Sequence, residues 1–154
     1  MNKKVEIHKT IVENLKEDSG SALKKYQSIN VGKFSLLSLF KYEFISTFVS
    51  PLPGAAGYVL RKFFFKSLIG KLGRGSIFGR NITLRCPGQI NIGDDFVTDN
   101  NVVLDSKGEN SGISIGDSTF IGNSTIFSCA SAHIKVGNNV SIGPNCCIRA
   151  SRVM

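Results

Sequence analysis

The chain has 154 residues, a net charge of +8 and four cysteines, and it contains two histidines and no tryptophan. This length fits one domain, or one domain with an appendage, and the composition is neither that of a disordered chain nor that of a fibrous one. Two histidines are too few for a zinc site of three convergent histidines, and the cysteines show neither C-x-x-C spacing nor a disulfide framework, so we expect no bound metal.

The positive charge is concentrated in the first half of the chain. Residues 1–74 contain 13 basic and 5 acidic residues, whereas the 6 basic and 6 acidic residues from position 75 onward cancel. This asymmetry favours an anionic neighbour for the first half, either a membrane surface or a charged substrate, although a solvated basic face is the simpler explanation. The basic residues interleave with apolar stripes instead of forming one cluster, so we expect no nucleic-acid partner.

The first half is also predicted to be helical. An amphipathic helix is expected over residues 4–18, and a short helix at 22–26 within a polar linker. Residues 33–49 carry a broad apolar stripe at helical spacing, two prolines then break the backbone, and a second Phe-rich helix is expected over residues 55–68. The longest uncharged run, residues 44–60, has 17 residues with two prolines and is shorter than the roughly 20 apolar residues that cross a bilayer.

From residue 75 onward the sequence repeats. Three repeats begin at Ile90, Ile113 and Ile134, which lie 23 and then 21 residues apart. Each repeat has an aliphatic residue, any residue, an aliphatic residue, Gly, and then Asp or Asn. Each repeat continues with a period of six residues, here called the six-residue beat. The period predicts side chains that point into the core at Ile92, Thr98, Leu104, Ile115, Ile121, Phe127, Val136, Ile142 and Ile148. Such spacing is typical of stacked units in which short buried strands end at turns rich in Gly, Asp, Asn and Ser, which need a positive φ or hydrogen bonds from side chains to the backbone.

Four residues after the aliphatic position of each hexad comes a second inward position. These positions are Phe96, Val102, Thr119, Thr125, Val140 and Cys146. Cys146 is therefore expected to be a small buried hydrophobe, and Cys147 to point outward. Residues 105–112 interrupt the beat, and we expect them to form a loop that bulges from a corner of the coil, where solenoids usually meet ligands.

Residues 78–150 resemble the hexapeptide-repeat acyltransferases in the hexads that begin at Ile92, Ile115, Ile121, Val136 and Ile142. The resemblance implies a left-handed parallel β-helix. The predicted fold class is therefore mainly β, with an incomplete β-helix at 75–154 preceded by a basic α-helical segment at 1–74. The handedness rests on the family, because left-handed crossovers between parallel strands are otherwise rare.

The helices before the repeats have two candidate roles. They would cover the open first coil, as the polar-faced cap of a solenoid does, or residues 33–72 would lie in a membrane interface as basic, Phe-rich amphipathic helices. We favour the cap, because similar sequences in the family place helices at the same position.

The resemblance also implies a function. Such proteins transfer an acetyl group from acetyl-CoA to a hydroxyl or an amine, often on a sugar, and they form homotrimers whose sites lie between neighbouring solenoids. For this chain we expect an acetyl-CoA-dependent O-acetyltransferase that acts on a hydroxyl of a sugar or polysaccharide precursor. A histidine would be the general base, and backbone amides or a small polar group would bind the oxyanion. A catalytically inactive, truncated remnant or a non-catalytic β-helical binding or structural protein is the alternative.

Two residues are candidates for the site. By resemblance, Asn101 in Asn101-Val-Val-Leu-Asp would touch the acceptor, although a corner asparagine that saturates turn amides is the favoured interpretation. His133 is the histidine within the repeats, but the next hexad follows it at once, without the extended loop that normally follows an active histidine in the family. We therefore favour a turn histidine.

The pattern stops within a circuit at Met154. We therefore expect further coils and the catalytic histidine to lie outside this chain, and we assign no catalytic residue within it. The sequence shows no signal peptide and no disulfide framework, so the cytoplasm is the expected location, with peripheral contact at the inner face of the membrane if residues 33–72 bind lipid.

Overall fold

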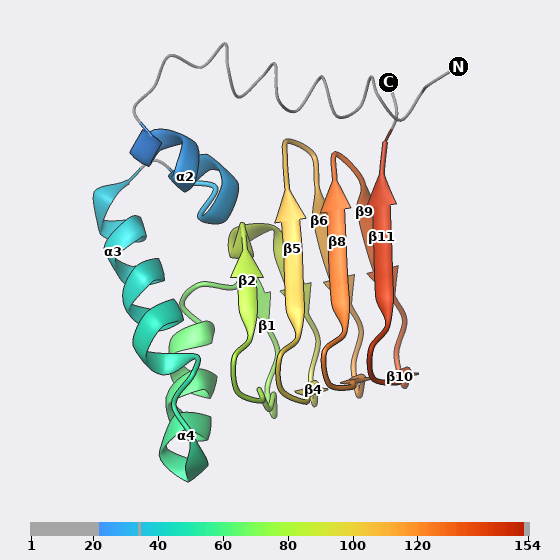
Figure 1. Cartoon of the computed structure of the whole chain (residues 1–154). Coiled ribbons are helices and arrows are strands. Elements are labelled where there is room, and N and C mark those ends of the chain that lie inside the picture. The colour runs from blue at the N-terminus through green and yellow to red at the C-terminus, as the bar shows by residue number, and fades with distance from the viewer. Residues whose placement is uncertain (1–21, 34, 153–154) are drawn as a thin grey trace.

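A computed structural model describes residues 22–33 and 35–152. The described chain is helical as far as residue 65 and then winds into a parallel β-solenoid of about four turns (Figure 1). The predicted fold class, mainly β with a parallel β-helix after an α-helical segment, is confirmed. The helix predicted at 4–18 lies outside the described residues.

The helices follow the predicted apolar stripes with shifted ends. Helix α2 (Ala22–Asn30) is longer than the short helix expected there. The stripe at 33–49 forms α3 (Leu36–Phe44) and a π-helical turn, η1 (Ile45–Val49). Helix α4 (Gly54–Phe65) begins directly after the proline-rich turn. Among the described residues, no helix is long and apolar enough to cross a bilayer.

Three parallel sheets form the sides of the solenoid. In sheet order the first sheet contains β1 (Lys71–Leu72), β3 (Ile90–Ile92), β6 (Gly112–Ile115) and β9 (His133–Val136). The second sheet contains β4 (Val97–Thr98), β7 (Phe120–Ile121) and β10 (Ser141–Ile142). The third sheet contains β2 (Thr83–Arg85), β5 (Val103–Lys107), β8 (Ile126–Ala130) and β11 (Cys147–Ser151). The first paired strand is thus β1, which begins four residues before the predicted domain boundary at residue 75. The boundary itself stays a prediction.

The inward positions of the six-residue beat form the core. The six predicted for the two inner coils are each at most 4% exposed: Ile92, Thr98, Leu104, Ile115, Ile121 and Phe127. In the last described coil the corresponding residues pack against the same core but are only partly buried: Val136, Ile142 and Ile148. The second inward set follows the same rule, since Phe96 and Thr119 are buried while Val140 and Cys146 are half-buried, and Cys147 is exposed as predicted.

The corners have the positive φ that the pattern predicts, but it does not lie at the glycine. In Gly93-Asp94-Asp95 the positive φ of 54° belongs to Asp95, two residues after the glycine, and Ser118 and Asn139 occupy the same corner in the next coils with φ of 53° and 55°. The glycine is required instead by close approach. A Cβ added at Gly93 would lie 2.2 Å from Oδ1 of Asp117 in the next coil. Asx and serine residues therefore carry the left-handed turn, and glycine allows the coils to stack.

Side chains at this corner tie each coil to the previous one. The Oδ1 atom of Asp94 accepts a hydrogen bond from the Arg74 amide at 2.7 Å. Asp117 accepts in the same way from the Asp94 amide, and Asn138 from the Asp117 amide, each at 2.8 Å. The Asp or Asn after each glycine thus satisfies a backbone N–H that the turn leaves without a strand partner.

The loop predicted at 105–112 is shorter than expected. Strand β5 continues through Lys107 and β6 begins at Gly112, so that only residues 108–111 leave the ladder. The reason is pairing: Asp105, Ser106 and Lys107 all lie in register with residues of β8. The extra residues therefore extend a strand before they form a corner.

The helices pack against the first coil. Ile45, Val49 and Phe65 belong to the same buried cluster as the solenoid interior. The Phe65 ring lies 5.0 Å from that of Phe78, which lies 5.6 Å from that of Phe96, so an aromatic stack leads from α4 into the coils. This is the packing that the cap interpretation requires, and Figure 1 shows α3 and α4 beside β2 at the first-coil end.

Candidate functional site

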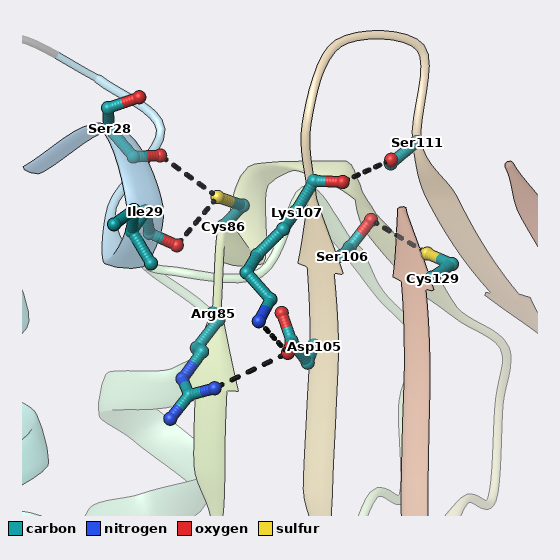
Figure 2. A network of polar contacts seen from close by, with 9 residues as sticks. All are labelled: Ser28, Ile29, Arg85, Cys86, Asp105, Ser106, Lys107, Ser111 and Cys129. Carbon is teal, nitrogen blue, oxygen red and sulfur yellow. Dashed lines mark hydrogen bonds and ion pairs between the residues drawn. The ribbon is translucent and has the colours of Figure 1, made fainter. Parts of the chain in front are cut away.

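A buried carboxylate lies on the outer face of the third sheet. Asp105 in β5 is 3% exposed although its side chain points outward, because Val103, Asp105 and Lys107 alternate with the inward Leu104 and Ser106. Its Oδ2 atom lies 3.4 Å from a guanidinium nitrogen of Arg85 and 3.0 Å from Nζ of Lys107. Figure 2 shows dashed lines that join this carboxylate to both side chains.

The second oxygen of this carboxylate has no hydrogen-bond partner. Within the described residues, Oδ1 of Asp105 is the buried side-chain atom for which no donor is found. Buried acceptors are almost always satisfied, so this atom has unused capacity for a hydroxyl, an amine or a water molecule. The side chains of Arg85 and Lys107 are 39% and 38% exposed, so the buried carboxylate is paired with two partly solvated cations.

The strand register extends this site into a row across the sheet. Arg85 lies opposite Asp105, Asp105 opposite Ser128, and Ser128 opposite the exposed Arg149. We call these four residues the Asp105 row. It presents a cation, an anion, a hydroxyl and a second cation on successive coils, about 4.8 Å apart.

The thiols near this row are not suited to nucleophilic chemistry. Cys86 is buried at the end of β2 and donates to the carbonyl oxygens of Ser28 and Ile29 in α2, with sulfur to oxygen distances of 3.6 and 3.4 Å. Burial, with the charge of Asp105 as a second cause, raises the pKa of the Cys86 thiol to about 11. Cys129 is also buried and contacts Ser106 at 3.5 Å. At neutral pH Cys86 therefore stays protonated and holds α2 against the solenoid.

Asn101 lies at a corner of the second described coil. It is exposed, has a φ of 60° and occupies the position of Asn81, Ser124 and Asn145 in neighbouring coils. Its Oδ1 atom accepts a hydrogen bond from Nδ2 of Asn81 at 3.3 Å, and its amide N–H donates to the Arg80 carbonyl at 2.8 Å. These contacts are typical of an asparagine in a turn. The contact between Asn101 and the acetyl acceptor stays a prediction.

His133 is exposed at the start of β9, in register with Gly112 of β6. Its imidazole occupies the space beside that glycine, since a Cβ added at Gly112 would lie 2.6 Å from Nδ1. Asn101 lies at the corner that precedes the third sheet, whereas His133 belongs to the first sheet, so the fold places the two candidates on different sides of the prism. Among the described residues no group of three metal-ligating side chains is found.

Two small hollows lie where the helices meet the first coil. One, of about 210 Å³, is lined by Tyr42, Ser46 and Ser50 of the helices and by Asn81 and Thr83 of the coil. The other, of about 260 Å³, lies between the α2–α3 connection and Cys86. Both are smaller than the 300 to 1,000 Å³ that ligand pockets usually occupy.

The Asp105 row was not predicted from the sequence. The sequence pattern predicts a loop at Asp105, where the side chain would be solvated, so it does not predict the burial of this carboxylate. The signal that could have revealed it is the alternation that continues after Leu104, with apolar or small residues at every second position and Arg85 twenty residues earlier.

Comparison of the chain with protein-family models, with curated proteins and with solved structures gives no significant match.

Proposed function

We propose that this chain forms the left-handed β-helical part of an acetyl-CoA-dependent O-acetyltransferase that acts on a hydroxyl of a sugar or polysaccharide precursor. The observation that carries the proposal is the repeated hexad itself: aliphatic residues face the core, and glycine followed by Asp or Asn joins the coils at the corner after the first sheet. This is the pattern on which the resemblance to hexapeptide-repeat acyltransferases rests. A homotrimer with sites between solenoids belongs to the same proposal.

The reaction needs few protein groups. A general base removes the proton of the acceptor hydroxyl, the oxygen attacks the thioester carbon, and the tetrahedral intermediate expels the CoA thiolate, which takes up a proton. The products are the acetyl ester and free CoA. We assign the general base to no residue of this chain. Asn101, whose carbonyl oxygen is used by Asn81, would offer its amide nitrogen to an oxygen of the acceptor.

The outer face of the third sheet offers groups that fit acetyl-CoA. The phosphates of CoA require cationic partners, and Arg149 and Arg152 are exposed on the last described coil. The column beside the Asp105 row contains Val103, Ile126 and Cys147, and Ile126 is 38% exposed, so an apolar strip is available for the pantetheine arm. The unpartnered Oδ1 atom of Asp105 would accept a hydrogen bond from an amide of that arm.

Binding of acetyl-CoA is the first test, because it does not require the general base. Isothermal titration should detect binding, and replacing Arg149 and Arg152 by Ala should weaken it roughly tenfold or more, since each charge-assisted contact is worth about 1.5 to 3 kcal/mol. Arg74→Ala is the matched control, because Arg74 is exposed at a corner far from the third sheet. Sedimentation should show a trimer.

Transfer is then measured with radiolabelled acetyl-CoA and a panel of sugar acceptors, on a protein that joins this chain to the general base that we assign to none of its residues. A thiol reagent is unsuitable here, because the exposed Cys147 would itself react. Asn101→Ala should lower incorporation into the acceptor while leaving binding of acetyl-CoA unchanged. A folded chain that neither binds acetyl-CoA nor forms trimers would exclude the enzyme and leave the non-catalytic β-helical protein as the assignment.

A further inference from the structure

The helices expose a large apolar face on the side away from the solenoid. Phe63 of α4 is 75% exposed and Leu37 of α3 is 80% exposed. The complete set of large exposed apolar side chains on these elements is Leu36, Leu37, Phe40, Phe44, Phe48, Val59, Leu60 and Phe63. We call this set the Phe face. Soluble monomers rarely leave so many large apolar side chains together in water, so the face marks a contact surface.

The Phe face is continuous across the helices. The ring of Phe44 lies 5.5 Å from that of Phe48 and 6.1 Å from that of Phe64, and Phe64 lies 5.6 Å from Phe63. These contacts join α3 and η1 to α4, which lie beside each other in Figure 1. The two helical segments therefore present one surface.

Capping the solenoid does not account for this face. The residues that cover the first coil are Ile45, Val49 and Phe65, which are at most 3% exposed and face the solenoid core. The Phe face uses other positions of the same helices. The cap and the interface interpretations of this segment are therefore compatible.

The charge around the Phe face is predominantly positive. Residues 22–72 contain eight basic residues and one acidic residue, Glu43. Glu43 is engaged, because the hydroxyl of Tyr26 donates to its carboxylate. Lys41, Lys62 and Lys66 are exposed on or next to the helices that carry the phenylalanines. A partner that binds the Phe face thus needs an apolar region that contacts the phenylalanines and negative charges that contact the lysines around them.

We propose that the Phe face binds the interface of an anionic lipid bilayer, with the phenylalanines inserted at the acyl boundary and the lysines at the headgroups. No described helix can span a bilayer, so the helices lie in the plane of the interface. A second copy of the chain fits less well, because an isologous contact would bring the same lysines of both copies together. The proposal does not depend on acetyl transfer.

Flotation with lipid vesicles tests the proposal on the full chain. We expect the protein to float with vesicles of phosphatidylcholine and phosphatidylglycerol, and to float much less with phosphatidylcholine alone or at about 0.5 M salt. Replacing Phe40 and Phe63 by Ser should lower partitioning roughly a hundredfold, from the transfer free energy of two phenylalanines. Replacing Lys62 and Lys66 by Gln should lower it roughly thirtyfold. Phe120→Ser, which removes a half-buried phenylalanine from the second sheet of the solenoid, is the matched control and should leave flotation unchanged.

A fluorescence measurement adds an independent readout. The chain has no tryptophan, so Phe63→Trp introduces the only indole. Its emission should shift to the blue on addition of anionic vesicles, whereas an indole introduced by Lys135→Trp on the first sheet of the solenoid should not respond. Circular dichroism of each variant shows whether it is folded.

Three results would overturn the proposal. The first is a folded protein that does not float with anionic vesicles. The second is a Phe63→Trp emission that is unchanged by lipid. The third is sedimentation in which the protein without lipid is an oligomer that Phe40→Ser and Phe63→Ser convert to a monomer, because the Phe face would then be a contact between copies of the chain.

Discussion

At the scale of single residues, the corner glycines show how closely the coils approach. A Cβ at Gly116 would lie 2.3 Å from Oδ1 of Asn138 and 2.6 Å from the backbone of Gly137. At Gly137, which has the same place in the last described coil, nothing lies within 4 Å. Among the described residues, the same turn therefore requires glycine in one coil and has room for a side chain in the last one.

We expect Gly116→Ala to lower the free energy of unfolding by about 1 to 3 kcal/mol, because the methyl group would push two backbones apart. Gly137→Ala is the matched control and should change it by less than about 0.5 kcal/mol. Urea unfolding followed by circular dichroism measures both. Equal losses in the two variants would show that the turn conformation, and not the stacking distance, requires glycine.

Cys86 predicts a pH dependence of stability. Its pKa is raised from 9.0 to about 11 in the folded protein, so between these values the unfolded chain loses the thiol proton and the folded chain keeps it. The unfolded state then binds fewer protons, and stability falls as pH rises from about 9 to about 11. This contribution is fully present below pH 9.

Cys86→Ser should reduce this fall, because serine does not titrate in that range. The comparison uses urea midpoints of the wild type and the variant from neutral pH upward, since tyrosines and lysines titrate equally in both. In native protein at pH 8, a thiol reagent should modify Cys147 first and Cys86 only after unfolding. Parallel pH profiles for the two proteins would contradict the assignment.

Which single residues could be predicted follows from the physics of each position. The inward residues repeat every six positions and are apolar, so pattern alone locates Leu104 and Phe127. The need for glycine at the corners is not predictable, because the sequence does not contain the distance to the next coil. Asp105 could not be placed, because its burial depends on Arg85 and Lys107, which are brought beside it by strand register and by alternation.

At the scale of elements, Arg61 joins α4 to the first coil. It is 3% exposed and its Nε atom donates to the Phe78 carbonyl at 3.0 Å, while a terminal nitrogen donates to the Leu52 carbonyl at 2.6 Å. Desolvation by burial lowers the pKa of the Arg61 guanidinium. No carboxylate is near enough to pair with it in the described part of the chain, so these carbonyl oxygens are what compensates its burial.

We expect Arg61→Lys to destabilise the protein by about 2 kcal/mol, since an ammonium group cannot reproduce the fork that reaches both carbonyls and would leave an acceptor unsatisfied. Lys62→Ala, one residue along the same helix and exposed, should have almost no effect. Thermal or urea unfolding measures the difference. A neutral Arg61→Lys variant would show that one contact is enough to hold α4.

The sequence predicts the helices better than it predicts their ends. The apolar stripe at 33–49 identifies α3 but not the change to the π-helical η1, which brings Ile45 and Val49 to the core cluster. That change depends on the surface of the first coil, with which the helix has to pack. The periodicity of one segment does not predict the surface against which that segment packs.

At the scale of the whole molecule, each coil contacts only its neighbours, so stability should vary along the axis. Strands β5 and β8 are paired on both sides, whereas β11 pairs on one side with β8 among the described strands. Hydrogen exchange with mass spectrometry should show the slowest exchange in peptides around Leu104 and Phe127, and faster exchange from residue 133 onward. Uniform protection from β3 to β11 would contradict this order and indicate one cooperative unit.

The architecture as a whole was predictable because a repeat multiplies a weak signal: one hexad is ambiguous, but many in phase require stacked coils. The Phe face was only half predictable. Composition showed phenylalanines and lysines together, but which of them face water depends on how α3 and α4 lie on the first coil.

The unequal lengths of the coils have a practical consequence. Seven residues separate Ile90 from Val97 and also Ile113 from Phe120, and six separate Val97 from Val103 and also Phe120 from Ile126. The difference between coils is taken up only on the return from the third sheet to the first, where Val103 to Ile113 takes ten residues and Ile126 to Ile134 takes eight. The corner between the third sheet and the first thus accepts connections of different length, while the other two corners keep a constant length. A peptide tag or reporter inserted at residues 108–111 would leave those two corners unchanged.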